Sequence, residues 1–313
     1  MTKYRCQYVD NGITFFYDAV RICCKSAHNG VGKPFLSNYS TYDVDQIIKK
    51  KQEYKQKLYS GEIPCECQGC VFVKETDTLN EDNSIYFIDI DSFNTCNSLC
   101  VYCEVRKQNF TEKPVLPIFK DLFKRKLLKN HEHGYISFAG GEPTLMKDFD
   151  KVVDLCIKSG IQNYMIHTNA IKFSKSIEKL LKKTNAKVIV SLDSSCEETF
   201  LKVKKVPQYK NVISNLKRYA KAQKKNSLAL RSKYIIIPGY NDSIEEIEKW
   251  YDLSVSLGIK FLILDVEMIW FNENNQQITP QIQKMVDVIK ERCIRDNIVL
   301  DFYESLKVYY KAN

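Results

Sequence analysis

The chain has 313 residues, of which 44% are hydrophobic, and it carries a formal net charge of +9. This length permits one large domain plus a small one, and the hydrophobic share suffices for a sizeable core. Residues 1–11 show no basic-then-apolar signal pattern, and no apolar run approaches the ~18 residues of a membrane span. Twelve cysteines without a signal sequence indicate a reducing, cytoplasmic location, where cysteine clusters bind metals rather than form disulfides.

Many of the lysines occur in short runs, such as Lys49-Lys50-Lys51, that lie on or beside predicted helices. We interpret these runs as solvated helix faces. No basic stripe interleaved with aromatic residues indicates a nucleic-acid partner. The positive balance would favour an acidic substrate or carrier through long-range attraction.

The region before about Asn83 does not follow a regular strand–helix rhythm, and it is rich in cysteine. Its cysteines are Cys6, Cys23, Cys24, Cys65, Cys67 and Cys70. A small segment with many loops and little core gains stability from a metal clip. Our preferred ligand set is Cys6, Cys23, Cys67 and Cys70, with Cys24 or Cys65 as alternatives. Four thiolates suit either an iron–sulfur cluster or a structural zinc ion.

From about Asn83 onward, predicted strands alternate with amphipathic helical patterns. The predicted strands are residues 84–91, 135–139, 161–167, 187–193, 229–237 and 260–266. Such alternation favours an α/β fold with a parallel sheet and right-handed crossovers. After a polar loop, Thr279 is expected to cap a helix that has Pro280 at its first position. A last strand over residues 298–302 and a short helix complete the chain. The predicted domains are residues 1–82, 83–271 and 272–313.

Three cysteines follow the first of these strands in a Cys-x3-Cys-x2-Cys spacing, at Cys96, Cys100 and Cys103. Three thiolates this close together can hold three irons of a cubane cluster, which leaves one iron open for another ligand. The alternatives are a zinc knuckle or a disulfide staple. Zinc sites usually take four ligands in two pairs, and no matching second pair follows closely.

A second motif, Gly140-Gly141-Glu142-Pro143, follows the next predicted strand. The glycines allow the backbone to approach a ligand closely, and the proline suits the entry to a helix. Alone, the motif would be an ordinary strand–helix turn. In this order and at this distance from the cysteines, it indicates a cofactor site.

These two motifs together resemble those of the radical S-adenosylmethionine (SAM) superfamily. The resemblance implies a partial (β/α)6 barrel of the TIM-like type, a [4Fe–4S] cluster on Cys96, Cys100 and Cys103, and SAM bound to the open iron. One electron from the cluster would split the sulfur–C5′ bond of SAM. The resulting 5′-deoxyadenosyl radical would abstract hydrogen from a substrate. A flavodoxin or ferredoxin would be a suitable electron donor.

The resemblance also implies roles for further residues at the carboxyl ends of the barrel strands. Gly140, Gly141 and Glu142 would hold the ammonium group of SAM, with Pro143 shaping the turn. Asn169 ends the third strand in a Thr-Asn-Ala sequence, where the family has Thr-Asn-Gly. Ser191 and Asp193 would reach the ribose hydroxyls of SAM. Tyr102 would lie near the adenine. Arg231 or Lys233 would pair with the SAM carboxylate. Cys196 lies near the expected mouth of the barrel, where its thiol could return a hydrogen atom to a substrate radical, although a loop cysteine without a role is the alternative.

The N-terminal cysteines resemble the SPASM or twitch module of many radical SAM enzymes, which encloses an auxiliary [4Fe–4S] cluster. In those enzymes the module usually follows the barrel, whereas here it would precede it. The resemblance favours peptide modification by crosslinking, oxidation or epimerisation. Radical modification of a sugar or carrier-linked metabolite is the alternative. A non-catalytic electron-transfer protein is a third hypothesis, although such a protein needs no SAM pocket.

Overall fold

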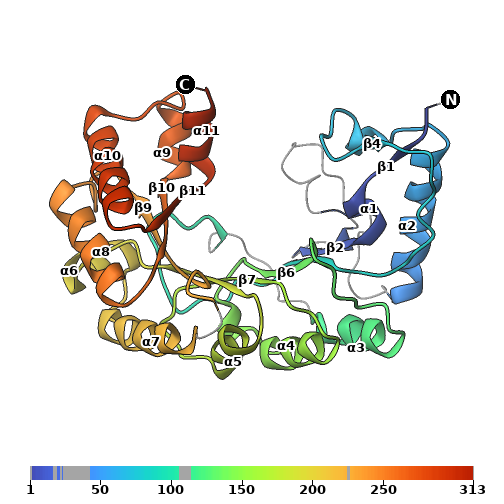
Figure 1. Ribbon diagram of the computed structural model, residues 1–313, viewed down its shortest axis with the longest axis horizontal. Coiled ribbons are helices and arrows are strands. Elements are labelled where there is room, and N and C mark those ends of the chain that lie inside the picture. The colour runs from blue at the N-terminus through green and yellow to red at the C-terminus, as the bar shows by residue number, and fades with distance from the viewer. Residues whose placement is uncertain are drawn as a thin grey trace. The chain divides into compact units, whose positions relative to one another are not determined.

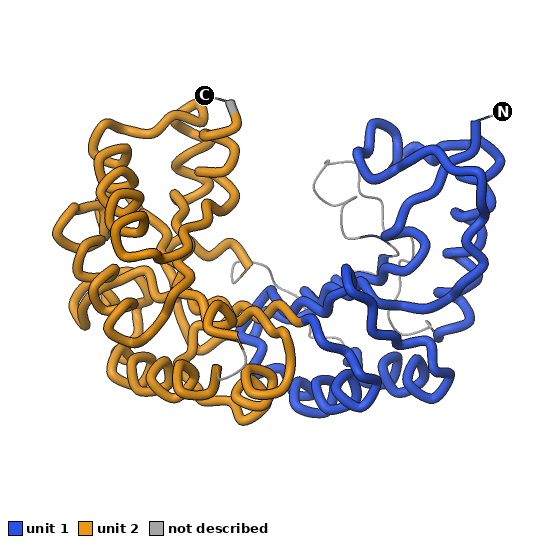
Figure 2. Tube along the Cα trace, in the orientation of Figure 1, with its two compact units in different colours: residues 1–95, 108–163 blue, residues 96–107, 164–313 orange. Residues whose placement is uncertain are grey.

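The structure is a computed structural model, and it describes residues 2–16, 20, 21, 23, 43–105, 114–223 and 226–312. The chain divides into two compact units, which Figure 2 distinguishes by colour. Unit 1 comprises residues 1–95 and 108–163, and unit 2 comprises residues 96–107 and 164–313. Both units consist of strands and helices in alternation, so the chain is an α/β protein (Figure 1).

Unit 1 contains a sheet in which β6, β5, β2 and β3 are neighbours in that order. These strands are β2 (Gly12–Phe16), β3 (Val20–Arg21), β5 (Phe87–Asp91) and β6 (Tyr135–Phe138). β2, β5 and β6 pair in parallel, whereas β3 pairs antiparallel with β2. A separate antiparallel pair joins β1 (Tyr4–Arg5) to β4 (Lys74–Glu75).

Unit 1 also contains helices, of which α2 has a clear capping residue at its start. They are α1 (Gln7–Asn11), α2 (Val44–Tyr59), α3 (Leu116–Lys124) and α4 (Phe149–Lys158), with 3-10 turns at Cys65–Cys67 and Pro143–Leu145. At the start of α2, the Asp43 carboxylate accepts a hydrogen bond from the Gln46 N–H at 2.9 Å, as N-cap residues do. α3 and α4 lie side by side in Figure 1 and bury their apolar faces.

The parallel strand order begins earlier in the chain than we predicted. Gly12–Phe16 pairs in parallel with Phe87–Asp91, and α2 lies between these two strands in the sequence. Gly12–Phe16 has only five residues, and hydrophobic periodicity cannot distinguish a strand from other structure over so short a run. The sequence pattern therefore did not predict this strand. The domain boundary at residue 82 stays a prediction.

Unit 2 contains five parallel strands in the order in which they occur along the chain. They are β7 (Tyr164–Thr168), β8 (Lys187–Ser191), β9 (Leu230–Ile236), β10 (Phe261–Val266) and β11 (Val299–Phe302). Its helices are α5 (Lys175–Lys183), α6 (Glu197–Lys204), α7 (Tyr209–Ala222), α8 (Ile244–Ser256), α9 (Met268–Glu273), α10 (Pro280–Arg295) and α11 (Glu304–Ala312). Each of the six strands predicted after Asn83 is present, with bounds that differ by a few residues.

The core of unit 2 lies between its sheet and the flanking helices. Trp250 of α8 is fully buried, and its indole N–H donates to the Ser232 hydroxyl of β9 at 2.9 Å. The predicted helix after the polar loop is confirmed, because the Thr279 hydroxyl accepts from the Ile282 N–H at the start of α10. Among the described residues, no helix has the length and apolar character needed to cross a membrane.

One lysine of α2 contradicts our interpretation of the lysine runs as solvated faces. Lys51 is completely buried, and its ammonium group donates to the Gly12 carbonyl at 2.7 Å. Burial and, to a smaller extent, the nearby positive charge of Lys55 lower the pKa of Lys51 to about 7, against the attraction of Asp10. The buried side chain therefore ties α2 to the start of β2 at an electrostatic cost.

We predict that Lys51→Met will change how the stability of the protein depends on pH. The folded-state pKa lies below the unfolded one, so the wild type carries a penalty that is fully present below pH 7 and is relieved as pH rises toward 10. Relative to the Met variant, the wild type should gain on the order of 4 kcal/mol between these limits. Denaturant unfolding at pH 7 and pH 10 measures this difference. Lys50→Met, a charge change on the exposed face, should show no such gain.

Candidate active site

The three cysteines of the Cys-x3-Cys-x2-Cys motif lie on a loop that is bonded to the C-terminal end of α6. All three are half-buried, namely Cys96, Cys100 and Cys103. The Leu99 N–H donates to the Lys204 carbonyl at 2.9 Å, and the Val101 N–H donates to the Val203 carbonyl at 3.0 Å. The last carbonyls of a helix have no partner within the helix, so the loop satisfies them and is thereby positioned.

Two of the cysteine sulfurs have polar groups within hydrogen-bond distance. The Asn169 side-chain N–H donates to the Cys96 sulfur at 3.6 Å and to the Asn97 side-chain carbonyl at 2.8 Å. The Ser98 hydroxyl lies 3.2 Å from the Cys100 sulfur. Such donors favour thiolates over thiols and tune the sulfurs of iron–sulfur clusters.

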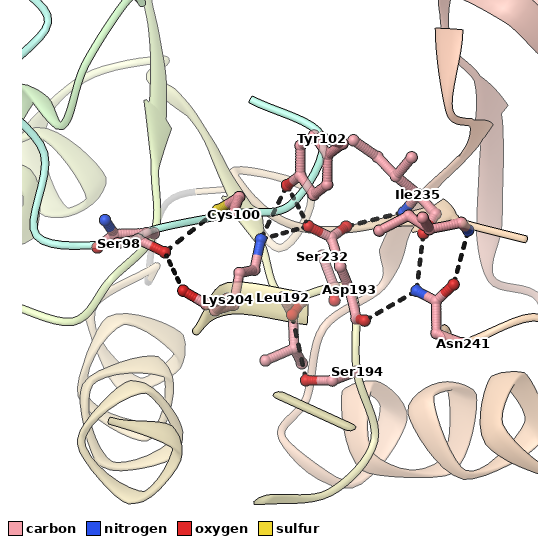
Figure 3. Close-up of polar contacts among 12 residues, drawn as sticks. Ser98, Cys100, Tyr102, Leu192, Asp193, Ser194, Lys204, Ser232, Ile235 and Asn241 are labelled. Atoms are coloured by element: carbon pink, nitrogen blue, oxygen red, sulfur yellow. Dashed lines mark hydrogen bonds and ion pairs between the residues drawn. The ribbon is translucent and has the colours of Figure 1, made fainter. Parts of the chain in front are cut away.

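A buried polar network lies directly behind this loop (Figure 3). Lys204 and Asp193 form an ion pair, with 1% and 0% of their side-chain surfaces exposed. The Tyr102 hydroxyl donates to the Asp193 carboxylate at 2.6 Å and accepts from the Lys204 ammonium at 2.9 Å. The second carboxylate oxygen of Asp193 accepts from the Ile235 N–H at 2.8 Å. The network therefore joins the cysteine loop to the ends of α6, β8 and β9.

The pKa values in this network show how close the charges lie to the cysteines. Burial alone would lower the pKa of Lys204, but attraction to Asp193, Cys100 and Cys96 raises it above its ordinary value. Burial, Asp193 and Cys100 together raise the pKa of Tyr102 well above its ordinary value. The lysine is therefore a cation and the tyrosine a neutral donor at neutral pH.

Sequence reasoning did not identify Lys204. One signal was present, because Lys204 stands four residues after Phe200, which is 1% exposed on the buried face of α6. Asn241 is a second residue to which sequence reasoning assigned no role. Its amide donates to the carbonyls of Asp193 at 3.0 Å and Ile235 at 2.8 Å, so it ties the turn after β8 to the end of β9.

The structure places the predicted ribose ligands at the carboxyl end of β8. Ser191 is the last residue of this strand and is half-buried. Asp193 has a positive φ of 53°, and both of its carboxylate oxygens have partners within unit 2. The predicted ribose contact of Asp193 would therefore require one of these internal bonds to be exchanged.

Gly140 and Gly141 pack against the segment that leads into the cysteine loop. Gly140 has a φ of +88°, and a Cβ atom on Gly141 would lie 2.4 Å from the Thr95 carbonyl oxygen. The Gly141 N–H donates to the Phe93 carbonyl at 2.8 Å, and the Glu142 N–H donates to the Thr95 carbonyl at 2.9 Å. These glycines are thus required by a contact within the protein, in addition to any ligand.

Glu142 is 2% exposed, and one of its carboxylate oxygens caps the following 3-10 turn. That oxygen accepts from the Thr144 N–H at 3.2 Å and from its hydroxyl at 2.8 Å, with Pro143 as the first residue of the turn. A buried carboxylate held in this way suits a cationic group such as the SAM ammonium. The assignment of Glu142 to that group stays a prediction.

The Thr168-Asn169-Ala170 turn adopts the conformation for which glycine is usual. Ala170 has a φ of 56°, and its N–H donates to the Thr168 hydroxyl at 3.1 Å. The Asn169 side-chain carbonyl accepts from the Ile171 N–H at 2.9 Å, which leaves its N–H₂ group directed at Cys96 and Asn97. The structure therefore places Asn169 beside the expected cluster.

Arg231 and Lys233 are two residues apart on β9, so they point to the same face of the strand. The Arg231 guanidinium stacks 3.7 Å from the centre of the Phe261 ring, and burial lowers its pKa. The Lys233 ammonium lies 4.2 Å from the centre of the Tyr303 ring. Lys233 also lines a cavity that reaches the cysteine loop, whereas Arg231 is not among its lining residues.

This cavity of about 240 Å³ is lined entirely by residues of unit 2. Tyr102 and Cys103 line it on the loop side, and Lys233 and Asp265 line it on the strand side. Burial raises the pKa of Asp265 to about 6, against the attraction of Lys233. Three further carboxylates line the cavity, namely those of Glu104, Glu267 and Glu304. The charged residues of its lining are therefore mostly acidic, with Lys233 as the cation among them.

Cys196 lies at the N-terminal boundary of α6 and is half-buried. Its thiol donates to the Thr199 hydroxyl at 3.4 Å. It is not among the residues that line the cavity beside Cys103. The role of Cys196 as a hydrogen-atom donor stays a prediction.

The N-terminal cysteines partly converge in unit 1. Cys6 and Cys23 belong to one buried cluster, and Cys67 is also buried. Burial raises the pKa of the Cys6 thiol to about 12, and the proximity of Cys23 and Cys70 raises it further. Of the two alternatives, Cys65 is exposed, whereas Cys24 lies outside the described residues.

In the described ranges of the chain, no three His, Cys, Asp or Glu side chains are arranged to hold a metal ion. The chemistry of the Cys96, Cys100 and Cys103 loop nevertheless fits an anionic cluster. Donors from Asn169 and Ser98 approach two of its sulfurs, and a buried ammonium lies close behind them. Both features stabilise the negative charge that thiolate-bound iron brings.

A comparison with protein families decides the relationship of this chain. The family described as "Radical SAM superfamily" matches residues 90–253, which is more than half of the chain. The chain belongs to the radical SAM superfamily. SAM and a [4Fe–4S] cluster are therefore its cofactors, and the matched range includes both the cysteine loop and Gly140–Glu142.

Curated relatives of this radical SAM chain include enzymes with different reactions. A GTP 3′,8-cyclase of Clostridium botulinum is 27% identical over 188 residues, which cover 58% of this chain and 56% of the relative. A 7,8-dihydro-6-hydroxymethylpterin dimethyltransferase of Methanocaldococcus jannaschii is 26% identical over 190 residues, which cover 58% of this chain and 35% of the relative. The chain thus spans about half the length, or less, of these relatives.

Solved structures confirm the radical SAM fold. SuiB of Streptococcus suis bound to S-adenosylmethionine has a TM-score of 0.53 at 17% identity, over 84% of this chain and 57% of SuiB. SuiB bound to the precursor peptide SuiA has a TM-score of 0.52 at 15% identity, over 96% of this chain and 72% of SuiB. At these identities the likeness shows the fold, which is the predicted α/β partial barrel.

We predict that Gly141→Ala will destabilise the protein, because its new methyl group would lie 2.4 Å from the Thr95 carbonyl. The expected loss is about 3 kcal/mol, at the upper end for overpacking. The matched control is Gly160→Ala, where nothing lies within 4 Å of the added methyl but φ is +80°. That control should lose only about 1 kcal/mol. Urea unfolding of the two variants measures both losses, and equal losses would contradict the close approach.

Proposed function

We propose that this chain cleaves SAM reductively and uses the resulting radical to remove a hydrogen atom from a peptide. The observation that carries the proposal is the loop of Cys96, Cys100 and Cys103. It lies within the matched family range, and donors approach its sulfurs. An electron carrier without turnover would not need the Gly140–Glu142 segment or a cavity beside Cys103.

Different residues would bind the cluster and the two polar groups of SAM. Cys96, Cys100 and Cys103 would hold the cluster, which when bound supplies the electron for SAM cleavage. Glu142 would bind the SAM ammonium. Lys233, the one cation among the cavity-lining residues, would bind the SAM carboxylate, because the other ionisable side chains beside it are carboxylates.

The peptide substrate is supported by two features. A solved structure with the same fold contains a precursor peptide, SuiB with SuiA. In addition, the carboxylates of Glu104, Asp265, Glu267 and Glu304 at the cavity would attract cationic groups and repel a triphosphate. The net charge of +9 of the whole chain would attract an acidic electron donor such as flavodoxin or ferredoxin.

A nucleotide is the second candidate substrate, because the relative from Clostridium botulinum is a GTP 3′,8-cyclase. A sugar or carrier-linked metabolite is a further alternative of the same reaction class. Incubating the reduced enzyme with SAM and either GTP or a lysine-containing peptide separates the candidates. Consumption of GTP to a cyclised product would overturn the peptide proposal.

We also propose that Cys6, Cys23, Cys67 and Cys70 bind an auxiliary [4Fe–4S] cluster. The strand pair β2 and β3 separates Cys6 from Cys23, as the SPASM or twitch resemblance requires. Burial of Cys6 beside Cys23 and near Cys70 supports a common site, because crowded buried thiolates need a metal to compensate their charge. Four protein thiolates would leave no open iron, so this cluster would transfer electrons or stabilise the fold.

Our first functional prediction is that anaerobically reconstituted protein, reduced with dithionite, will convert SAM to 5′-deoxyadenosine. Cys100→Ala should abolish this product, because three thiolates are needed to hold the cluster with one open iron. Chromatography of the product measures the reaction. Cys196→Ala serves as the matched control and should retain SAM cleavage, since Cys196 is not in the ligand set. Product formation by Cys100→Ala at the wild-type rate would contradict the assignment of Cys100 as a cluster ligand.

The second functional prediction concerns metal content. The reconstituted wild type should contain about eight irons per chain, counted as two four-iron clusters. A Cys67→Ala, Cys70→Ala double variant should retain about four, together with SAM cleavage activity or at least the SAM-responsive cluster signal. Elemental analysis gives both numbers. About four irons and one zinc in the wild type would instead support a structural zinc site on the N-terminal cysteines.

A further inference from the structure

The cysteine loop is attached to a helix end that is electrostatically unfavourable for an anionic cluster. The loop bonds to the carbonyls of Val203 and Lys204, at the negative end of the α6 dipole. A cluster with three thiolates adds further negative charge at this place. A compensating positive charge must therefore lie close to the sulfurs.

Lys204 supplies that charge from the last turn of the same helix. Its ammonium contacts Asp193 and lies 2.9 Å from the Tyr102 hydroxyl, and its side chain is 1% exposed. Its backbone carbonyl accepts from Leu99 at 2.9 Å and lies 3.4 Å from the Ser98 hydroxyl. One residue thus contacts the cysteine loop through both its backbone and its side chain (Figure 3).

The buried pair is oriented, with its positive end linked to the cysteines. Figure 3 shows the Lys204 ammonium between Cys100 and the Asp193 carboxylate, and negative charge on Cys100 and Cys96 favours its charged form. The negative end, Asp193, is held on its other side by the Ile235 N–H at 2.8 Å and through its carbonyl by Asn241 at 3.0 Å. The charge of the lysine is therefore kept near the cluster site and is not screened by water, because the pair is buried.

We propose that Lys204 is a positioning residue that fixes the cysteine loop and raises the midpoint potential of the SAM-binding cluster. This inference rests on the proposed assignment of that cluster to Cys96, Cys100 and Cys103. Reduction adds an electron to the cluster, so a nearby fixed cation stabilises the reduced form more than the oxidised form. Asp193 has the opposite effect on the potential and at the same time holds the lysine in place.

The test is a redox titration of the SAM-responsive cluster signal by electron paramagnetic resonance. Lys204→Met should lower the midpoint potential by at least about 59 mV, the equivalent of a tenfold change in a one-electron equilibrium. Asp193→Asn should raise it, because the substitution removes a negative charge near the cluster. Lys202→Met on the same helix is the matched control, and its exposed ion pair with Glu198 should leave the potential unchanged.

Opposite shifts in the two variants separate a charge effect from simple loosening of the loop. A merely structural role would destabilise both variants and move both potentials in the same direction or in neither, and either result would overturn the proposal. If Lys204→Met does not retain the cluster, the proposed role of Lys204 in fixing the loop is supported. The effect on the midpoint potential is then tested by Asp193→Asn alone, and the potential of this variant must lie above that of the wild type. A wild type without any SAM-responsive signal would instead refute the proposed function.

Discussion

The buried ion pair between Lys204 and Asp193 is the interaction on which the site depends. Two charges removed from water are tolerated only when each compensates the other and when hydrogen bonds satisfy the remaining donors and acceptors. Tyr102 and the Ile235 N–H complete this requirement. Because the four residues come from the cysteine loop, the end of α6, the turn after β8 and strand β9, satisfying one charge pair brings these segments together. The ion pair and its hydrogen bonds therefore help to fix the position of the cysteine loop.

A second constraint acts on the entrance to the same loop, within unit 1. Gly140 and Gly141 lie against residues 93–95 so closely that a side chain on Gly141 would overlap the Thr95 carbonyl. Sequence reasoning attributed these glycines to the approach of a ligand. The structure shows that the backbone leading to the cysteines already requires them, so one motif supports both the chain path and the predicted cofactor contact.

The N-terminal region combines two structural tasks. Residues 12–16 extend the parallel sheet of unit 1 beside β5, and the buried Lys51 attaches α2 to the start of this strand. The flanking cysteines, Cys6 and Cys23, pack in one buried cluster. A metal bound by these thiolates would therefore be attached to the segments on either side of β2. Loss of the metal would be expected to destabilise β2 as well as the cysteine segment.

The sequence by itself determined the features that depend on near neighbours. The spacing of Cys96, Cys100 and Cys103, the Gly140-Gly141-Glu142 turn, the six strands after Asn83 and the capped start of α10 are all readable over a few residues. Ligand spacing and hydrophobic periodicity are local properties, and they sufficed for the superfamily and its fold. They did not reveal that β2 joins the sheet, because that depends on a strand partner 75 residues away in the register of Gly12 with Phe87.

Only the tertiary structure decided which charged residues are buried. Lys51 and Lys204 occur in lysine-rich segments that are typical of solvated helix faces, yet both are removed from water. The predicted contact of Asp193 with the ribose of SAM stays a prediction, whereas the contact of its carboxylate with Tyr102, which is 91 residues distant in sequence, is visible only in the tertiary structure. The physical reason is that burial of a charge depends on which distant segments supply its counter-charge and hydrogen bonds, and no local pattern contains that information.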